Sequence, residues 1–206
     1  ASRYLYESIR IRSASQGLDV LCSGGCGCLG DSVEEILRSN GTELIAGDRQ
    51  AFDAISGTPV WATFGDITCS FEMDRNPREQ PSLAEMTDKA IKLLSRNRKG
   101  FFLMVEGSKV DYAAHAHDPA AFISELLAFD DAVGVALDFA RRDANTTVVI
   151  FTDHGTSALT LGSKYYDGYT RRPISAAFGS IYDYKASSER LSACICAAPR
   201  DSAKAI

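Results

Sequence analysis

The sequence predicts an α/β fold in which a mainly parallel sheet carries helices on both faces. Helix-like and strand-like apolar patterns alternate at short spacing. Two strand-like runs are almost entirely apolar, as strands covered on both faces require. Of the 206 residues, 45% are hydrophobic and 24% charged, which is typical of a globular protein with one core. Alternating helices and strands favour right-handed crossovers, which place helices on both faces of a parallel sheet.

The first part of the chain contains three short units of helix followed by strand. The apolar spacing predicts helices over 4–15, 32–38 and 48–55, and strands over 18–22, 42–46 and 60–64. Ser32 is the expected N-cap of the second helix, which Asn40-Gly41 ends. The stretch 66–80 has no apolar period and contains Pro77, so we expect a surface loop there.

The strongest helix signal follows this loop. Ser82, with Glu85 three residues later, forms a capping-box pattern that predicts a helix ending near Arg98. The next elements are apolar strands over 101–105 and 147–151, with a long helix over about 119–142 between them. In a sheet of this class, ligands gather beyond the carboxyl ends of the strands.

The charge balance excludes some classes of partner. A net charge of -5 and a pI near 5.2 argue against broad attraction to nucleic acid or to anionic lipid. No apolar run is long enough to span a bilayer, and the first residues lack the pattern of a signal peptide. An anionic substrate would therefore need local positive charge, such as bound metal ions. The six cysteines leave the redox compartment open.

Two polar clusters directly follow the two most apolar strands. Asp111 and His115 are four residues apart, so on a helical turn they share a face and can hold one metal ion. Asp153 and His154 can both reach a metal where the backbone turns after them, and Glu106 offers an oxygen ligand for Mg²⁺. A single acidic residue after a strand is more often a solvated loop residue or a helix cap. The pairing of two of the three histidines with carboxylates favours a metal site.

The three cysteines clustered at and after the end of the first strand allow two interpretations. Cys22, Cys26 and Cys28 could form a thiolate metal site, but buried or free thiols are the expected state. His117 also has an acidic neighbour, and we expect it to be a surface residue.

These residues resemble the alkaline phosphatase family. The resemblance rests on the stretches 86–91 and 100–107, followed by Asp111, His115 and Thr152-Asp153-His154. Steps of five, four and 38 residues separate Glu106, Asp111, His115 and Asp153 in turn, and these intervals match the family pattern. Residues 19–25 also fit, so the likeness covers most of residues 1–162, which we expect to be part of the family's α/β core.

The resemblance implies a phosphomonoesterase with two zinc ions and one magnesium ion. By the family's pattern, Asp111 and His115 would bind the first zinc, Asp153 and His154 the second, and Glu106 the magnesium. Paired cations about 4 Å apart can stabilise the entering and leaving oxygens of an in-line phosphoryl transfer.

The chain also departs from the family's pattern. The Asp-Ser-Ala setting of the nucleophilic serine is absent before the metal cluster, and its one occurrence at 201–203 comes too late. No histidine follows His154, although the family has a second histidine on the first zinc. We therefore expect an incomplete fold, an internal fragment without the catalytic nucleophile, that alone binds metal weakly and hydrolyses phosphate esters poorly. Residues 163–206 are expected to begin a lid or crown-like insertion or to form an irregular C-terminal segment.

Other implications of the resemblance are less specific. Arg3 is a candidate to bind the substrate phosphate, and an exposed terminal arginine is the equal alternative. The family is commonly periplasmic or secreted, and homodimers are common in it. Two other functions stay open: a non-catalytic metal-binding or interaction module on the same fold, and a related phosphodiesterase or sulfatase. The Glu-Gly-Ser stretch with its downstream spacing follows the monoesterase branch.

Overall fold

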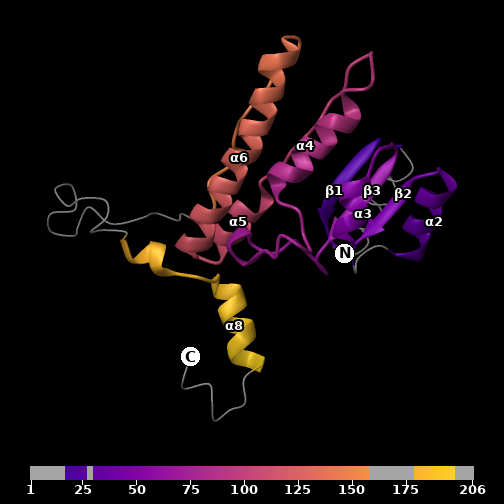
Figure 1. Cartoon of the computed structure of the whole chain (residues 1–206). Coiled ribbons are helices and arrows are strands. Elements are labelled where there is room, and N and C mark those ends of the chain that lie inside the picture. Colours follow the sequence, from indigo (N-terminus) through magenta and orange to yellow (C-terminus); the bar gives the residue numbers. More distant parts are fainter. Residues whose placement is uncertain (1–16, 27–29, 158–178, 198–206) are drawn as a thin grey trace. The chain divides into compact units, whose positions relative to one another are not determined.

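A computed structural model of the chain describes residues 17–26, 30–157 and 179–197. These residues fall into two compact units (Figure 1). Among the described residues, the sheet unit comprises 17–26, 30–70, 76–105 and 132–146, and the helical unit comprises 71–75, 106–131, 147–157 and 179–197. The predicted helix over 4–15 and Arg3 lie outside the described residues.

A parallel sheet of three strands organises the sheet unit. Its strands are β1 (Val20–Gly24), β2 (Glu43–Ala46) and β3 (Val60–Phe64), in the order β1-β3-β2. Both neighbours run parallel to β3, and Val60 faces Val20 on one side and Glu43 on the other. The predicted fold class is confirmed, and the predicted range of the third strand agrees with the structure.

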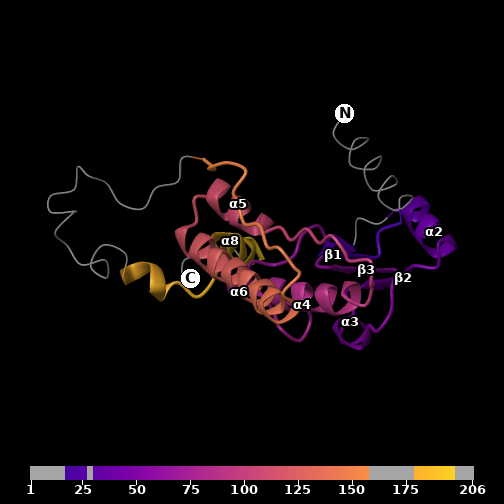
Figure 2. The same cartoon turned by 90° about the horizontal axis from the view of Figure 1, so that it is seen from above.

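The central strand β3 is buried along its whole length because helices cover both faces. Val60 and Phe64 pack in one cluster with Phe52 of α3 (Arg49–Ala54) and Leu93 of α4 (Leu83–Leu94). Trp61, which alternation directs to the opposite face, packs against α2 (Asp31–Ser39). Figure 2 shows α2 and α3 on opposite sides of the sheet.

Two glycines permit the tight course of the chain around the ends of β1 and β3. Gly65 has φ +64°, and a Cβ atom there would lie 2.1 Å from the carbonyl oxygen of Thr68. A Cβ atom on Gly24 would lie 2.6 Å from the backbone nitrogen of Cys69. Only glycine avoids backbone clashes at these two positions, so the loop can close directly over the strand ends.

The capping box predicted at Ser82 is present at the start of α4. The Glu85 amide donates to Ser82 Oγ (3.1 Å), and the Ser82 amide donates to Glu85 Oε2 (2.7 Å). Arg49 of α3 also donates from Nη2 to Glu85 Oε1 (2.6 Å). The bond from Arg49, with the contact to Ser82, lowers the pKa of Glu85 to about 2 although burial opposes this.

Glu85 is therefore expected to contribute to stability in a pH-dependent way. Because its folded-state pKa is depressed, its contribution is present above about pH 4.5 and is lost as the pH falls toward 2. In Glu85→Gln the free energy of unfolding should depend less on pH in this range. Urea unfolding at several pH values between 3 and 6 measures this. Glu34→Gln, which removes an exposed pair with Arg38, is the matched control. An unchanged pH dependence in Glu85→Gln would contradict the assigned role.

Two predicted strands are absent from the sheet. Neither 101–105 nor 147–151 forms strand pairing in the described residues, and the prediction that they are buried strands is wrong for this structure. Phe102 is 90% exposed and Phe151 is 80% exposed. A buried parallel strand needs hydrogen-bonded neighbours and a cover on each face, and apolar composition alone does not supply them.

Smaller corrections concern the ends of helices. The N-cap of α2 is Gly30, not Ser32, and it makes no side-chain capping bond. The helix α4 ends at Leu94, four residues before the predicted end at Arg98, because Ser95 begins a turn there. Within the predicted surface loop, Glu72–Asp74 form the short 3₁₀ helix η2.

The helical unit is built around α5 (Ser108–His115) and the first half of α6 (Pro119–Asp143). The other described elements are η2, the 3₁₀ helix η4 (Gly179–Asp183) and α8 (Ser188–Ala197). A small core joins Phe71 to Ala113 of α5 and Ala121 of α6. His117, exposed as predicted, has φ 51° and turns the chain from α5 into α6.

Two carboxylates fix the remaining segments of the helical unit. Asp118 accepts from the Ala121 amide (3.0 Å) and from the Ser188 amide (2.6 Å). Burial raises the pKa of Asp118, but these bonds outweigh burial and lower the pKa overall. Asp74 accepts from the hydroxyl of the buried Ser187 at 2.5 Å. The carboxylates thereby hold α8 against η2 and the start of α6.

Among the described helices, none combines the length and apolarity that crossing a bilayer requires. The prediction that residues 163–206 begin a lid or crown-like insertion stays a prediction. Within that range the structure describes only residues 179–197.

Candidate metal site

The helix α5 presents the first pair of predicted metal ligands. Asp111 and His115 lie one helical turn apart, and His115 Nε2 is 3.5 Å from Asp111 Oδ2. The opposite face of the helix packs inward through the buried Ala113, and Ala114 on its flank is also buried. This burial fixes the orientation of α5, so the side chains of Asp111 and His115 are held on its more exposed side.

The second pair lies in the segment that follows the apolar run 147–151. His154 Nε2 is 3.3 Å from Asp153 Oδ2, and the His154 amide donates to Asp153 Oδ1 (3.0 Å). Both side chains are exposed. The backbone bends at Asp153, which lets these neighbouring side chains approach one another, whereas on an extended strand they would point to opposite faces.

Two hydroxyl groups connect the pairs. Thr156 Oγ1 donates to Asp111 Oδ1 (2.5 Å) and lies 3.2 Å from His154 Nδ1. Ser157 Oγ lies 3.1 Å from His115 Nδ1. Residues more than 40 positions apart in the sequence therefore meet, and four of the five predicted ligands are linked through one short segment.

The spacing within each pair suits zinc. Two ligands that each bind a tetrahedral zinc ion at about 2.1 Å are separated from one another by about 3.4 Å. The measured separations between carboxylate oxygen and imidazole nitrogen are 3.5 Å for Asp111 and His115 and 3.3 Å for Asp153 and His154. In donor type and in spacing, each pair therefore fits as two of the ligands of one zinc ion.

The two pairs do not by themselves form a complete metal site. In the described part of the chain, no three side chains of His, Cys, Asp or Glu are grouped so that they could hold one ion. Glu106, the predicted magnesium ligand, is exposed immediately before Gly107, the N-cap of α5. Its assignment as a ligand stays a prediction, as does the role of Arg3.

A positive charge is buried on α5 next to the first pair. Lys109 is 9% exposed, and its Nζ lies 3.9 Å from the centre of the Phe71 ring and 5.1 Å from that of Tyr112. The carboxylate of Glu189 is 4.0 Å from Lys109 Nζ. Contacts with aromatic faces keep a buried cation stable and fix the turn of α5 that carries Asp111.

Sequence reasoning did not identify Lys109, Thr156 or Ser157. A signal for the two hydroxyls was present, since they follow the pair Asp153-His154 directly after Gly155. Hydroxyl side chains close to a metal-ligand pair are suited to orient the imidazole ring from its other nitrogen.

The cysteine cluster is less suited to bind a metal ion than the two Asp and His pairs. Burial raises the pKa of Cys22 to about 11, which keeps it a neutral thiol rather than a metal-binding thiolate. Cys26 donates its thiol to the carbonyl oxygen of Thr63 (2.7 Å). Both cysteines are half-buried free thiols, which agrees with the interpretation as buried or free thiols, and Cys28 lies outside the described residues.

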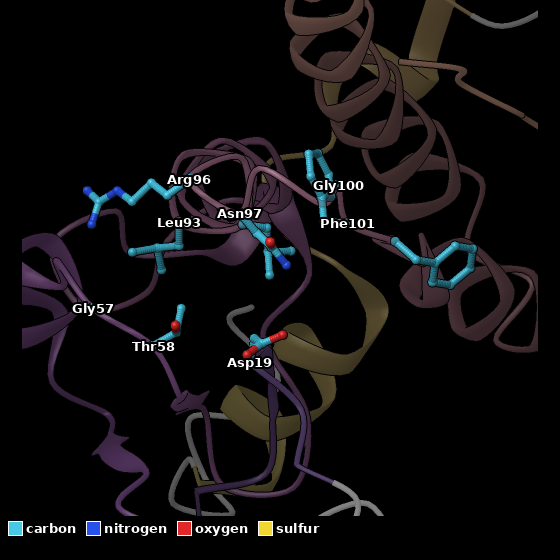
Figure 3. Close-up of a pocket in the computed structure, with 10 residues that line it drawn as sticks. Asp19, Gly57, Thr58, Leu93, Arg96, Asn97, Gly100 and Phe101 are labelled. Carbon is cyan, nitrogen blue, oxygen red and sulfur yellow. The ribbon is translucent and has the colours of Figure 1, made fainter. Parts of the chain in front are cut away.

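A cavity of about 380 Å³ lies in the sheet unit. Figure 3 shows Leu93 and Asn97 on one side of it and Thr58 and Asp19 on the other. None of the predicted metal ligands lines this cavity, so it contributes nothing to the candidate metal site.

The known proteins that are similar to this chain are alkaline phosphatases. A family model described as alkaline phosphatase matches residues 30–193, which is more than half of the chain. The chain is 32% identical to the alkaline phosphatase of Schizosaccharomyces pombe over 216 aligned positions, covering 91% of this chain and 40% of that protein.

Two solved structures are similar in fold. The alkaline phosphatase of Thermus thermophilus superposes with a TM-score of 0.81 at 24% identity, covering 96% of this chain and 43% of that one. A mutant of the TAB5 alkaline phosphatase, with Mg bound in its M3 site, superposes with a TM-score of 0.56 at 30% identity, covering 69% and 42%. The chain spans less than half the length of these proteins and of its curated relatives.

Proposed function

The chain belongs to the alkaline phosphatase family, and from this premise we propose that it carries part of the metal centre of a phosphomonoester hydrolase. The observation that carries the proposal is the pair of Asp and His couples, each with the spacing of two zinc ligands and both joined through Thr156. A protein of net charge -5 needs such local cations to bind a phosphate ester.

Each predicted ligand has a proposed role. Asp111 and His115 hold one zinc ion and Asp153 and His154 hold a second, while Glu106 contributes an oxygen ligand to magnesium. Bound zinc would neutralise charge on the phosphoryl oxygens and make a hydroxyl or water more acidic. Side-chain hydrogen bonds between α5 and the segment 153–157 support this proposal, because they hold the two Asp and His pairs near one another.

Other features of the proposal come from the family likeness. The reaction would use a serine nucleophile that these 206 residues do not supply, and Arg3 would bind the substrate phosphate through its guanidinium group. The substrate class is phosphate monoesters. A periplasmic or secreted location and assembly as a homodimer belong to the same proposal.

Phosphatase assays on the chain and on the full-length product of its gene test this function. The full-length protein is expected to hydrolyse p-nitrophenyl phosphate, to lose activity with a chelator, and to regain it with zinc and magnesium. The 206-residue chain with the same metals is expected to show little or no turnover.

Three outcomes would contradict the proposal in different ways. An inactive full-length protein that still binds zinc would indicate a non-catalytic metal-binding module. Faster hydrolysis of bis-p-nitrophenyl phosphate or of p-nitrophenyl sulfate would indicate a phosphodiesterase or a sulfatase. Zinc-dependent turnover by the chain alone would show that the catalytic groups are all present in it.

A further inference from the structure

The cavity of the sheet unit lies at the amino ends of two neighbouring parallel strands. Asp19 directly precedes β1, and Thr58 lies two residues before β3 begins. The end of α4 and the turn after it supply the opposite wall, which includes Leu93 and Asn97 (Figure 3). A volume of about 380 Å³ is in the range of binding sites for small organic molecules. Since no predicted metal ligand lines it, the chemistry of this cavity is separate from that of the proposed metal centre.

One part of the cavity wall is apolar and held in place by the core. Leu93 is buried and belongs to the core cluster between the sheet, α3 and α4. The ring of Phe101 packs against the ring of Phe139 on α6, with centroids 6.0 Å apart. Leu94 is a further apolar lining residue. An apolar group bound here would leave water without requiring these side chains to rearrange.

The side-chain amide of Asn97 is oriented by the turn that follows α4. Its oxygen accepts from the backbone amide of Lys99 (3.0 Å). Since a backbone amide can only donate, this contact identifies the oxygen of the Asn97 amide group. The NH₂ group makes no hydrogen bond to any residue that the structure describes. It is therefore the part of Asn97 that is available to donate to a ligand.

The charge that faces the cavity is negative. Among the described lining residues, only Asp19 and Arg96 carry a charge. Figure 3 shows Arg96 turned away from the cavity, and its guanidinium group donates to the carbonyl oxygen of Ser56. Asp19 is fixed through its backbone, because its carbonyl oxygen accepts from the Val60 amide (2.9 Å). Its carboxylate pairs with no cation in the part of the chain that the structure describes.

We propose that this cavity binds a small organic amine, with the ammonium group at Asp19 and the apolar body against Leu93 and Phe101. An ionised carboxylate attracts a cation and accepts its N–H groups. The hydroxyl oxygen of Thr58 can accept a second N–H group, and the NH₂ group of Asn97 can donate to an oxygen of the ligand. A carboxylate ligand would be repelled by Asp19. The inference does not depend on the proposed function.

Nuclear magnetic resonance titrations of the chain with three probes of similar shape test the site. At neutral pH phenethylamine carries an ammonium group, phenylethanol a hydroxyl group and phenylacetate a carboxylate. We expect phenethylamine to bind with a Kd of about 1 mM, as suits so small a ligand. Phenylethanol should bind about 5-fold more weakly, because Asp19 is exposed and water screens its ion pair. Phenylacetate should not bind. The side-chain amide signals of Asn97 and the backbone amide signal of Thr58 should shift with phenethylamine.

Two variants with the same chemical change locate the charge that selects the amine. Asp19→Asn keeps the size of the side chain and removes its charge, so phenethylamine and phenylethanol should then bind about equally. Asp31→Asn is the matched control, because Asp31 is an exposed carboxylate of α2 that does not line the cavity. It should retain the preference for the amine. Both substitutions are at exposed positions, and thermal unfolding of each variant shows whether folding is retained.

A preference for the amine that is lost in Asp19→Asn and retained in Asp31→Asn would support the site. Equal binding of phenethylamine and phenylethanol by the wild-type chain would overturn it, as would the absence of binding by either probe. A folded Asp19→Asn variant that keeps the preference would also overturn it. So would shifts that leave the signals of Asn97 and Thr58 unchanged, because the amine would then be bound elsewhere.

Discussion

Asp111→Asn is expected to weaken zinc binding by more than the roughly 10- to 100-fold that loss of an outer-shell partner costs. The amide has the same shape, but it carries no charge, so the attraction of the carboxylate for a divalent cation is lost. The Thr156 hydroxyl can still donate to the amide oxygen, so the connection to His154 is retained. The measurement is a zinc titration of the purified chain by isothermal calorimetry.

Asp138→Asn is the matched control for this experiment. Asp138 is an exposed carboxylate on α6 that pairs with Arg141 (2.7 Å) and is not a predicted ligand. Its substitution should leave the zinc affinity unchanged. Equal losses in both variants would mean that zinc responds to the net charge of the chain rather than to a defined pair of ligands.

Phe64→Ala is expected to destabilise the sheet unit by about 3–5 kcal/mol. Phe64 is fully buried at the end of β3, and its ring meets the ring of Phe52 edge-on with centroids 5.5 Å apart. The substitution removes this contact and leaves a cavity between the sheet and α3, which the surrounding side chains fill only partly. The free energy of unfolding in urea provides the measurement.

Phe102→Ala is the matched control, since it is the same substitution at a side chain that is 90% exposed. Its effect should fall within about 0.5 kcal/mol, as for most surface changes. A loss at Phe102 as large as that at Phe64 would show that the run 101–105 is packed in solution. The placement of this run would then be contradicted.

The elements that the sequence predicted well are those with a local signal. The strand Val60–Phe64 has four apolar residues and one threonine next to polar turns, and all five of its residues are buried. The capping box of Ser82 and Glu85 is specified by two residues three positions apart, and it occurs as expected. In both cases, the residues that determine the structure are neighbours in the sequence.

The apolar runs at 101–105 and 147–151 show where this reasoning fails. Their composition indicates a need for burial, but it does not identify the strands that would lie beside them. In the described residues they pair with no strand, and Phe102 and Phe151 are exposed. Strand pairing depends on residues distant in the sequence, which periodicity does not reveal.

In the candidate site, too, the sequence predicted the local features and missed those that join distant residues. The pair Asp111 and His115 follows from helical spacing, and the pair Asp153 and His154 follows from adjacency at a turn. Their connection through Thr156 could not be predicted, because it joins positions 45 residues apart by one hydroxyl. Only coordinates show that this hydroxyl meets both Asp111 and His154.

X-ray absorption spectroscopy at the zinc edge, on the zinc-loaded chain, tests the central claim most directly. The account predicts a first shell of nitrogen and oxygen at about 2.0–2.2 Å, with imidazole scattering from His115 and His154. A first shell of sulfur at about 2.3 Å would contradict it, because zinc would then be bound by some of the six cysteines.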